Sequence, residues 1–334
     1  DAVSKDDQYD TIIPIFVPPK TIDQMDVATN IHAALSKTKK TVLACFMGAG
    51  EESIGAEYLK QQGIPVYIFP EAIAKTLATI YGYRQWLSAP VGKYKSFKVN
   101  TARVNEILEK TLNGADGAIV GEQAIGILEA YGIPAAPYRF AGSAREAAEV
   151  AGEIGYPVVM KIASPDILHK SDVGGIELGI DSAQDLDAAY ERIMANVRRR
   201  MPDATIWGVT VQQQVPPGRE VIIGVDRHPS LGPVLMFGLG GVYVEVLHDV
   251  SFRLCPVTPL DAREMISEIR GLGILRGARG SAPADIDAIV DVICRVSALA
   301  LDFEDIVELD INPLIVGERG AGAIAADIRI GIGG

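Results

Sequence analysis

Apolar and polar positions follow one another in short blocks over the first 90 residues. Apolar stretches at 11–16, 41–46 and 66–69 predict buried strands. The stretches between and after them have the spacing of amphipathic helices, which we expect over 21–36 (opened by a capping box of Thr21 and Gln24), 54–63 and 70–86. Helices between strands favour a parallel sheet with right-handed crossovers. Three such units are too few for a complete doubly wound domain, so the pattern predicts the back half of one.

Beyond about residue 115 the pattern changes to α+β. Helical periodicity predicts helices over 124–131 (ended by Gly132), 143–154 (opened by a capping box of Ser143 and Glu146), 182–200, 261–270 and 284–300. Single strands are expected at 156–162 and 176–180, and a final pair at 306–316 and 323–330. Turn sequences separate four further strands, which we expect to form one antiparallel sheet, at 206–215, 219–227, 233–239 and 242–247.

A lysine-rich segment with few apolar positions separates these two patterns. We therefore expect three parts: a partial doubly wound domain over 1–95, a linker over 96–115, and a second domain over 116–334.

The last two strands predict a specific register. If 317–322 is the turn, Val316 faces Ala323, and counting back four residues on each side places Asn312 opposite Asp327. Since strand residues two apart share a face, Glu308 and Asp310 project beside Asn312.

This hairpin therefore gathers several oxygen donors without nitrogen or sulfur, a set that suits Mg²⁺ rather than zinc. The alternative is an ordinary half-exposed strand, with its acidic positions in solvent and its apolar side formed by Val307, Leu309 and Ile311. The alternation alone does not separate the two interpretations.

Lys161 comes near the end of an apolar strand and precedes a loop closed by Gly174 and Gly175. A lysine and backbone N–H groups in this arrangement suit anionic phosphates, although a lysine that merely reaches solvent at a strand end is the simpler alternative. The same loop contains His169. It is either a solvated histidine or, because neutral imidazole is a nucleophile near pH 7, a phosphate acceptor.

Gly238, Gly240 and Gly241 form a second glycine-rich segment, which would let the backbone approach an anion. It neither matches a dinucleotide-binding fingerprint nor opens a helix, which argues against that class of site. Glu220 is a candidate for binding a ribose hydroxyl. The glycine turn at 48–55 contains two glutamates that would repel a phosphate, so we interpret it as structural.

Composition narrows the function class. The 334 residues include 31 Lys plus Arg and 43 Asp plus Glu, a net charge of −12, and the mean hydropathy is +0.19. This charge argues against nucleic acid or an anionic membrane as the partner. The separated Cys45, Cys255 and Cys294 predict neither a disulfide framework nor a structural zinc site, and we expect a reducing, cytoplasmic compartment.

Taken in order, the motifs of the second part resemble the ATP-grasp region of NDP-forming acyl-CoA synthetases, relatives of succinyl-CoA synthetase. The stretches that carry the resemblance are GEQAIGILEAYGIP, GYPVVMKIASPDILHKSDVGGIELGI, VQQQVPPGREVIIGV, FGLGG and ELDINPL with AADIRI. The segment MGAGEESIGAEYLKQQGIPVYIFPEAIAKTLATIYGYR is similar to the flavodoxin-like ligase domain of the single-chain members. The fold implied is α/β and α+β, a partial flavodoxin-like sheet followed by an ATP-grasp domain.

The resemblance also implies roles for single residues. Those for the nucleotide and its metal are Lys161 on the phosphates, Gln214 and Val215 at the adenine hinge, Glu220 on the ribose, and Asn312 and Asp327 on Mg²⁺. Asp310 corresponds to the carboxylate that steadies a phosphohistidine, with Glu308 as a second candidate. His169 corresponds to a histidine that relays phosphate toward ADP or ATP.

The reaction implied is acyl-CoA + ADP + phosphate ⇌ carboxylic acid + CoA + ATP, through an acyl phosphate and a phosphohistidine. The family's CoA-binding domain and its domain with the first phosphohistidine have no counterpart in this sequence. We therefore expect a fragment that binds adenine nucleotide, works with those domains, and forms an oligomer. The alternatives are a synthetase-like sensor region of a protein lysine acetyltransferase and an amide-forming ATP-grasp ligase. The first segment and the HKSD motif argue against the latter.

Overall fold

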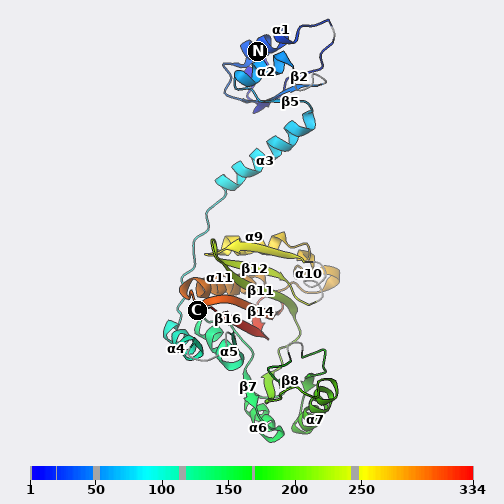
Figure 1. Ribbon diagram of the computed structural model, residues 1–334, viewed down its shortest axis with the longest axis vertical. Helices are drawn as coiled ribbons and strands as arrows, with labels where there is room; N and C mark the ends of the chain where they lie inside the picture. The colour runs from blue at the N-terminus through cyan, green and yellow to red at the C-terminus, as the bar shows by residue number, and fades with distance from the viewer. Residues whose placement is uncertain are drawn as a thin grey trace. The chain divides into compact units, whose positions relative to one another are not determined.

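The computed structural model describes residues 2–19, 21–47, 53–112, 118–167, 170–241 and 248–333. The chain divides into two compact units, Asp1–Pro90 and Val91–Gly334 (Figure 1). None of the helices in the described ranges is both long and apolar enough to cross a membrane. All three cysteines are free thiols.

The first unit contains the predicted parallel strands. Its elements are β1 (Thr11–Ile12), β2 (Ile15–Phe16), α1 (Gln24–Leu35), β3 (Thr41–Val42), β4 (Ala44–Phe46), α2 (Ile54–Gln61), β5 (Val66–Tyr67) and α3 (Pro70–Ser88), after a 3-10 turn at Val3–Lys5. β1 pairs with β3, and β4 lies between β2 and β5, in each case in parallel. Helices α1 and α2 pack on a small core around Phe46 and Leu59.

Two details of this unit differ from the sequence prediction. The strand expected at 11–16 is interrupted at Ile13 and Pro14, because proline has no N–H to give to a strand partner. The first helix begins at Gln24 instead of Thr21. Its N-cap is Asp23, whose carboxylate accepts the N–H of Met25 at 2.8 Å, so a nearer and stronger capping residue takes the role assigned to Thr21.

The second unit is built around a seven-stranded sheet in the order β13-β12-β11-β14-β16-β6, with β15 paired to β14. These strands are β6 (Ala118–Val120), β11 (Arg219–His228), β12 (Gly232–Leu239), β13 (Val250–Leu254), β14 (Ile306–Val316), β15 (Ala323–Ala325) and β16 (Ile328–Ile332). The helices of this part are α4 (Thr101–Leu112), α5 (Gly121–Ala130), α9 (Pro259–Glu268), α10 (Leu272–Leu275) and α11 (Ile286–Asp302), with a 3-10 turn at Ala278–Gly280.

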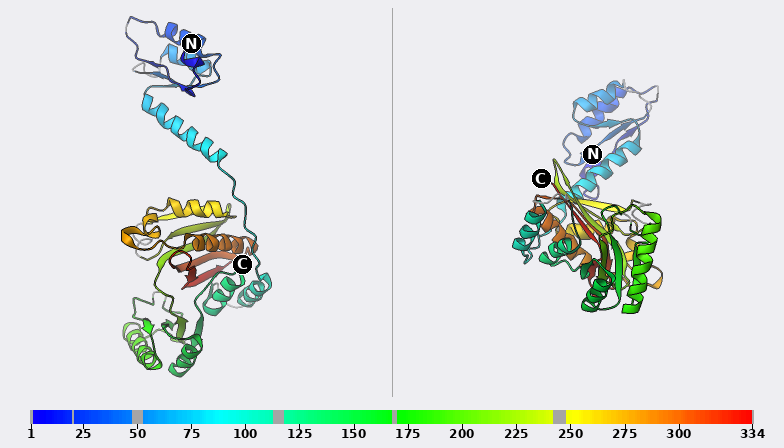
Figure 2. Two further views of the ribbon diagram at one scale, coloured as in Figure 1. Left: turned by 180° about the vertical axis from the view of Figure 1, so that it is seen from behind. Right: turned by 60° about the horizontal axis from the view of Figure 1, so that its bottom comes forward.

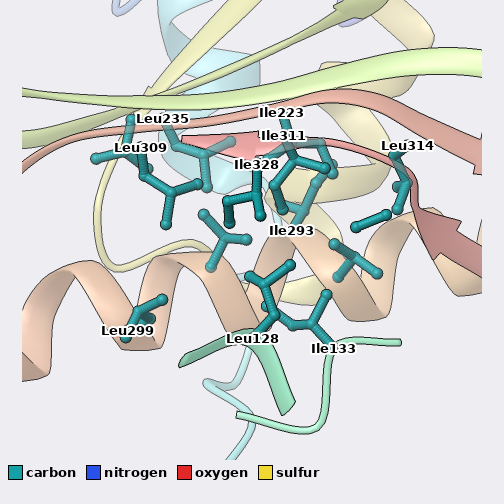
Figure 3. Packing of buried hydrophobic residues seen from close by; sticks show 14 of the residues in the cluster. Leu128, Ile133, Ile223, Leu235, Ile293, Leu299, Leu309, Ile311, Leu314 and Ile328 are labelled. Carbon is teal, nitrogen blue, oxygen red and sulfur yellow. The ribbon is translucent and has the colours of Figure 1, made fainter. Parts of the chain in front are cut away.

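Helices α5, α9 and α11 cover one face of this sheet and leave its other face open (Figure 1). Figure 3 shows Ile293 and Leu299 of α11 pointing toward Leu309, Ile311 and other sheet residues in the largest core of the molecule. The helices expected at 261–270 and 284–300 begin and end within two residues of α9 and α11.

A four-stranded sheet in the order β7-β10-β8-β9 forms the other layer of this unit. Its elements are β7 (Tyr138–Ala141), α6 (Ala144–Ile154), β8 (Val158–Ala163), β9 (Ile176–Ile180), α7 (Ala183–Arg200) and β10 (Gly208–Gln213). Both helices pack on one face, as Figure 2 shows, and both begin where predicted, after the N-caps Ser143 and Ser182. The other face carries polar side chains.

The prediction that the strands from 206 to 247 form a single antiparallel sheet is wrong. β10 belongs to the four-stranded sheet, whereas β11 and β12 belong to the seven-stranded one. Pro216 and Pro217 lie between β10 and β11 and offer no N–H groups, so the chain passes to a new sheet instead of turning back as a hairpin. The strand expected at 242–247 lies outside the described residues, and β6, β7 and β13 were not predicted.

Candidate functional site

The β14–β15–β16 hairpin has the predicted register. Val316 pairs with Ala323 and Ile311 with Ile328, and the N–H of Asn312 donates to the carbonyl of Asp327 at 3.2 Å. The turn is 317–322, closed by a hydrogen bond from the N–H of Gly317 to the carbonyl of Gly322 (2.9 Å). Asn312 and Asp327 therefore lie opposite each other at one end of the hairpin.

β14 turns its polar side chains to the open face of the sheet. Leu309 and Ile311 are 1% and 0% exposed in the core, and Asp310 and Asn312 alternate with them. Val307 was expected in the core but is only half-buried, because the pairing with β16 is irregular between Ile306 and Glu308.

A second irregularity changes the alternation within β14. On β11, Val221 pairs with Leu314 but Ile223 pairs with Ile311, so Asn312 and Pro313 together oppose Ile222. The strand thus contains one extra residue, a β-bulge. After it, Ile315 faces the same side as Asn312 and lies between Glu220 of β11 and Ile324 of β15.

The open face concentrates negative charge around Asp310. Burial raises the pKa of its carboxyl group, a hydrogen bond with Asn312 opposes the rise, and the charges of Glu308 and Asp327 increase it. Arg329 pairs with Asp310 across the strands and lowers its pKa in turn. The acidic side chains of Glu308, Asp310 and Asp327 therefore influence one another on this face, and their use as metal ligands stays a prediction.

Lys161 extends from β8 of the smaller sheet to the same place. Its side chain is 16% exposed, and its Nζ lies 3.8 Å from Oδ2 of Asp327 and 3.5 Å from the carbonyl oxygen of Ala326. Burial lowers the pKa of the ammonium group, and the charge of Asp327 opposes this decrease. Lys161, the candidate for binding phosphates, therefore contacts Asp327, a candidate metal ligand, although the two residues belong to different sheets.

Gln212 also belongs to this junction and was not predicted. It is buried, and its Nε2 donates to the carbonyl of Ala326 at 2.8 Å. Thr210 lies opposite Lys161 in the sheet and hydrogen bonds with the Tyr138 hydroxyl, which opposes the rise in the phenol's pKa that burial causes. The sequence signal was available: Thr210 and Gln212 are polar residues two apart within an apolar strand. Asp226, opposite Glu308 on β11, is a further unpredicted acid.

The segment between the sheets contains the two hinge candidates. Oε1 of Gln214 accepts the N–H of Gly179 at 2.6 Å, and the backbone N–H of Gln214 donates to Pro157 at 3.0 Å. Gln214 and Val215 line a pocket of about 450 Å³, whose other walls are 134–137, Pro157, Gln213, Pro216, Pro217 and Ile324. Glu220 does not line it, although it shares the sheet face of Ile324.

The three glycines at the end of β12 are explained by packing. A Cβ at Gly238 would lie 2.8 Å from Val250, and one at Gly240 would lie 2.9 Å from Glu220. Gly241 has a φ of 66°, in the left-handed region that favours glycine. Each glycine therefore has a structural reason, and their part in anion binding stays a proposal.

Comparison with known proteins decides the family. Residues 110–332 match the ATP-grasp domain family. The chain is 48% identical over 229 residues to "Acetate--CoA ligase [ADP-forming] I subunit beta" of Pyrococcus furiosus, a match that covers 69% of this chain and 97% of that protein. The chain belongs to the ADP-forming acetate–CoA ligase family.

Two further comparisons show the extent of the likeness. "Acetate--CoA ligase [ADP-forming] I" of Archaeoglobus fulgidus is 42% identical over 333 residues, which are 99% of this chain and 47% of that ligase. The chain thus spans about half the length of the first curated relatives that it matches. A solved structure of Ca. Korarchaeum cryptofilum "dinucleotide forming Acetyl-coenzyme A synthetase 1" is 38% identical, with a TM-score of 0.60 over 69% of this chain and 100% of that one. That structure is a complex with coenzyme A and Mg-AMPPCP, with its "phosphohistidine segment pointing towards nucleotide binding site".

His169, the acceptor candidate of this ligase-family chain, lies outside the described residues. The residues before and after it are held in place. Oδ2 of Asp166 accepts the N–H of Thr205 at 2.6 Å, and the N–H of Gly175 donates to the carbonyl of Lys170 at 2.8 Å. On the later side, Asn196 and Arg200 of α7 donate to the carbonyls of Gly174 and Asp172.

The metal candidates of this ligase-family chain suit a hard cation. Among the residues that the structure describes, no three His, Cys, Asp or Glu side chains form a ready-made metal site. Mg²⁺ is commonly bound by one or two carboxylates together with phosphate oxygens and water. The carboxylate of Asp327, the amide of Asn312 and the local excess of negative charge therefore fit a Mg²⁺ that binds together with a nucleotide.

Proposed function

We propose that this chain supplies the nucleotide-binding and phosphate-relay half of an ADP-forming acyl-CoA synthetase. The reaction is acyl-CoA + ADP + phosphate ⇌ carboxylic acid + CoA + ATP. The observation that carries the proposal is the ion pair between Lys161 of one sheet and Asp327 of the other, with Asn312 opposite Asp327 in the hairpin. The family membership supports it.

In this proposal the nucleotide lies between the two sheets. Its base lies at the hinge beside Gln214 and Val215, its ribose hydroxyls bind Glu220, and its phosphates meet Lys161. Gly238, Gly240 and Gly241 let the backbone come close to the phosphates, although the N–H of Gly240 already donates to the carbonyl of Glu220 at 2.8 Å. Asn312 and Asp327 hold Mg²⁺, which neutralises phosphate charge during phosphoryl transfer.

The relay step belongs to His169. An imidazole nitrogen takes the phosphoryl group that the acyl phosphate has passed to the first phosphohistidine, and it then transfers that group to ADP. Asp310, with Glu308 as the second candidate, steadies the charged imidazole, because a nearby carboxylate stabilises a cationic ring. The CoA-binding domain and the domain with the first phosphohistidine are the required partners, in an oligomeric and cytoplasmic enzyme. The Pyrococcus furiosus relative is a beta subunit, which supports a partner chain here.

Two measurements test this function. Calorimetry should show that the chain binds Mg-ADP or Mg-ATP. An assay of CoA ligation should show activity only after a chain is added that carries the CoA-binding domain and the domain with the first phosphohistidine. Robust ligation by this chain alone would contradict the proposal that it supplies only the nucleotide-binding and phosphate-relay half of the enzyme.

Incubation with γ-labelled Mg-ATP should give an acid-labile, base-stable phosphate that is lost in His169→Asn. His228→Asn is the matched control, because His228 is an exposed histidine far along the chain whose Nδ1 accepts the N–H of Ser230. Equal labelling of both variants would assign the phosphate to another residue.

A further inference from the structure

Three contacts from the four-stranded sheet converge on two residues of the seven-stranded sheet. The Nζ of Lys161 lies near the carbonyl of Ala326 and the carboxylate of Asp327, and the amide of Gln212 donates to the same carbonyl. Ala326 and Asp327 connect β15 to β16. This connection is therefore where the two sheets are tied together on the side proposed for the nucleotide.

Lys161 and Asp327 can each form an ionic interaction with one of two partners. A nucleotide phosphate and Asp327 compete for the ammonium group, and a divalent cation and Lys161 compete for the carboxylate. The Lys161 side chain is 16% exposed, so its charge needs a partner in either state. The carboxylate is 57% exposed and so remains accessible to a cation from solvent.

We propose that the Lys161–Asp327 ion pair is a latch that makes nucleotide binding depend on Mg²⁺. This inference rests on the proposed function. In the metal-free protein, phosphates must take Lys161 from Asp327 and then lie beside an uncompensated carboxylate. When the carboxylate turns to a cation, Lys161 is released to the phosphates. The bond from Gln212 to Ala326 does not involve either charge, so it holds the connection in place while the partners exchange.

The latch predicts opposite effects of one substitution with and without metal. Asp327→Asn keeps the size of the side chain but removes the charge that holds Lys161. It should bind metal-free ADP about three- to fivefold more tightly than the wild type does, the range expected for a partly exposed ion pair. It should also lose most of the gain in affinity that Mg²⁺ gives the wild type.

Removing any negative charge favours an anionic ligand, so a matched control is needed. Asp226→Asn removes a carboxylate from the same face of the sheet, opposite Glu308 on β11, that makes no ion pair with Lys161. It should change the affinity for metal-free ADP by less than twofold. In a Lys161→Met background, Asp327→Asn should lose its advantage, because no ammonium group remains to be released.

Calorimetric titration with ADP, in EDTA and in excess Mg²⁺, measures these affinities, and the thermal unfolding midpoint of each unliganded variant checks its folding. Asp327→Ser provides a second version if Asp327→Asn does not fold. If the wild type binds Mg-ADP but Asp327→Asn gains no more affinity for metal-free ADP than Asp226→Asn does, the latch is wrong and the proposed function stands. If the wild type binds ADP under neither condition, both are wrong.

Discussion

Asp285 connects the last long helix to the hairpin that carries the metal candidates. Its carboxylate caps α11 by accepting the N–H of Ala288 at 3.1 Å, and it also accepts those of Gly320 (3.0 Å) and Gly322 (2.9 Å) in the hairpin turn. The residue is 7% exposed. We expect Asp285→Ala to destabilise the fold by releasing the helix end and the turn together.

The size of the effect follows from these three bonds. Loss of an N-cap costs about 1 kcal/mol. Each further hydrogen bond to the charged carboxylate contributes about 1.5 kcal/mol, but Gly320 is exposed and Gly322 is half-buried, so water replaces part of that contribution. The free energy of unfolding should therefore fall by about 2–4 kcal/mol in Asp285→Ala. Asp285→Ser keeps the cap alone and should lose about 1–2 kcal/mol on the same reasoning.

The dependence on pH gives a second signature. Burial opposes ionisation of Asp285, but the backbone N–H groups of Gly322, Ala288 and Gly320, with that of Asp287, lower its pKa below the ordinary value. A carboxyl whose folded pKa is lowered stabilises the fold above its unfolded pKa of about 3.9, and this contribution is lost as the pH falls through the folded pKa. The difference between wild type and Asp285→Ala should therefore be constant from about pH 7 to 5 and should shrink below about pH 4.

Urea unfolding followed by circular dichroism measures the free energies, and hydrogen exchange of residues 317–322 locates the change. Asp287→Ala is the matched control in the same helical turn, because the Asp287 side chain is 72% exposed and forms a surface ion pair with Arg263. It should cost less than about 0.5 kcal/mol. A loss in Asp285→Ala no larger than that of Asp287→Ala, or one that persists unchanged at pH 3, would refute the reasoning.

Two further substitutions test the packing around the site. Arg227→Met should lower the free energy of unfolding by about 2–4 kcal/mol in urea, because it leaves buried carbonyls without their donor. Those carbonyls belong to Ala300, Phe303 and Ile306. Gly240→Ala should cost about 1–3 kcal/mol from the contact of its new Cβ with Glu220. Gly273→Ala, whose Cβ meets nothing within 4 Å, should be neutral or slightly stabilising, and equal thermal midpoints of the two glycine variants would contradict the steric argument.

Local signals predicted most of the elements and the register of the last hairpin. The register follows from the turn and from counting outward along both strands from Val316 and Ala323, whereas the β-bulge in β14 was not predicted. Capping was predictable where one strong candidate stood alone, as at Ser143, and failed where Asp23 competed with Thr21.

Assignment of strands to sheets was not predictable in the same way. β10 is followed by Pro216 and Pro217, and a sequence of strands and turns alone does not tell whether the chain pairs back or crosses to another sheet. The role of Gln212 depends on that choice, because its partner, Ala326, lies 114 residues further along the chain. The contact of Lys161 with Asp327 likewise exists only when both sheets are present.

The β-bulge at Asn312 and Pro313 changes which side chains of β14 lie on the open face of the sheet. Before the bulge, even-numbered side chains such as Asp310 lie on that face, and after it the odd-numbered Ile315 does. The aliphatic side chains of both halves lie in one core. A single strand thus serves the metal end and the base end of the proposed site. Insertion or deletion of one residue here would move the side chains of Leu314 and Val316 from the core to the open face of the sheet. It would also exchange the core-facing and open-facing sides of the terminal hairpin. We therefore expect related sequences to vary in residue type along β14 but to keep its length.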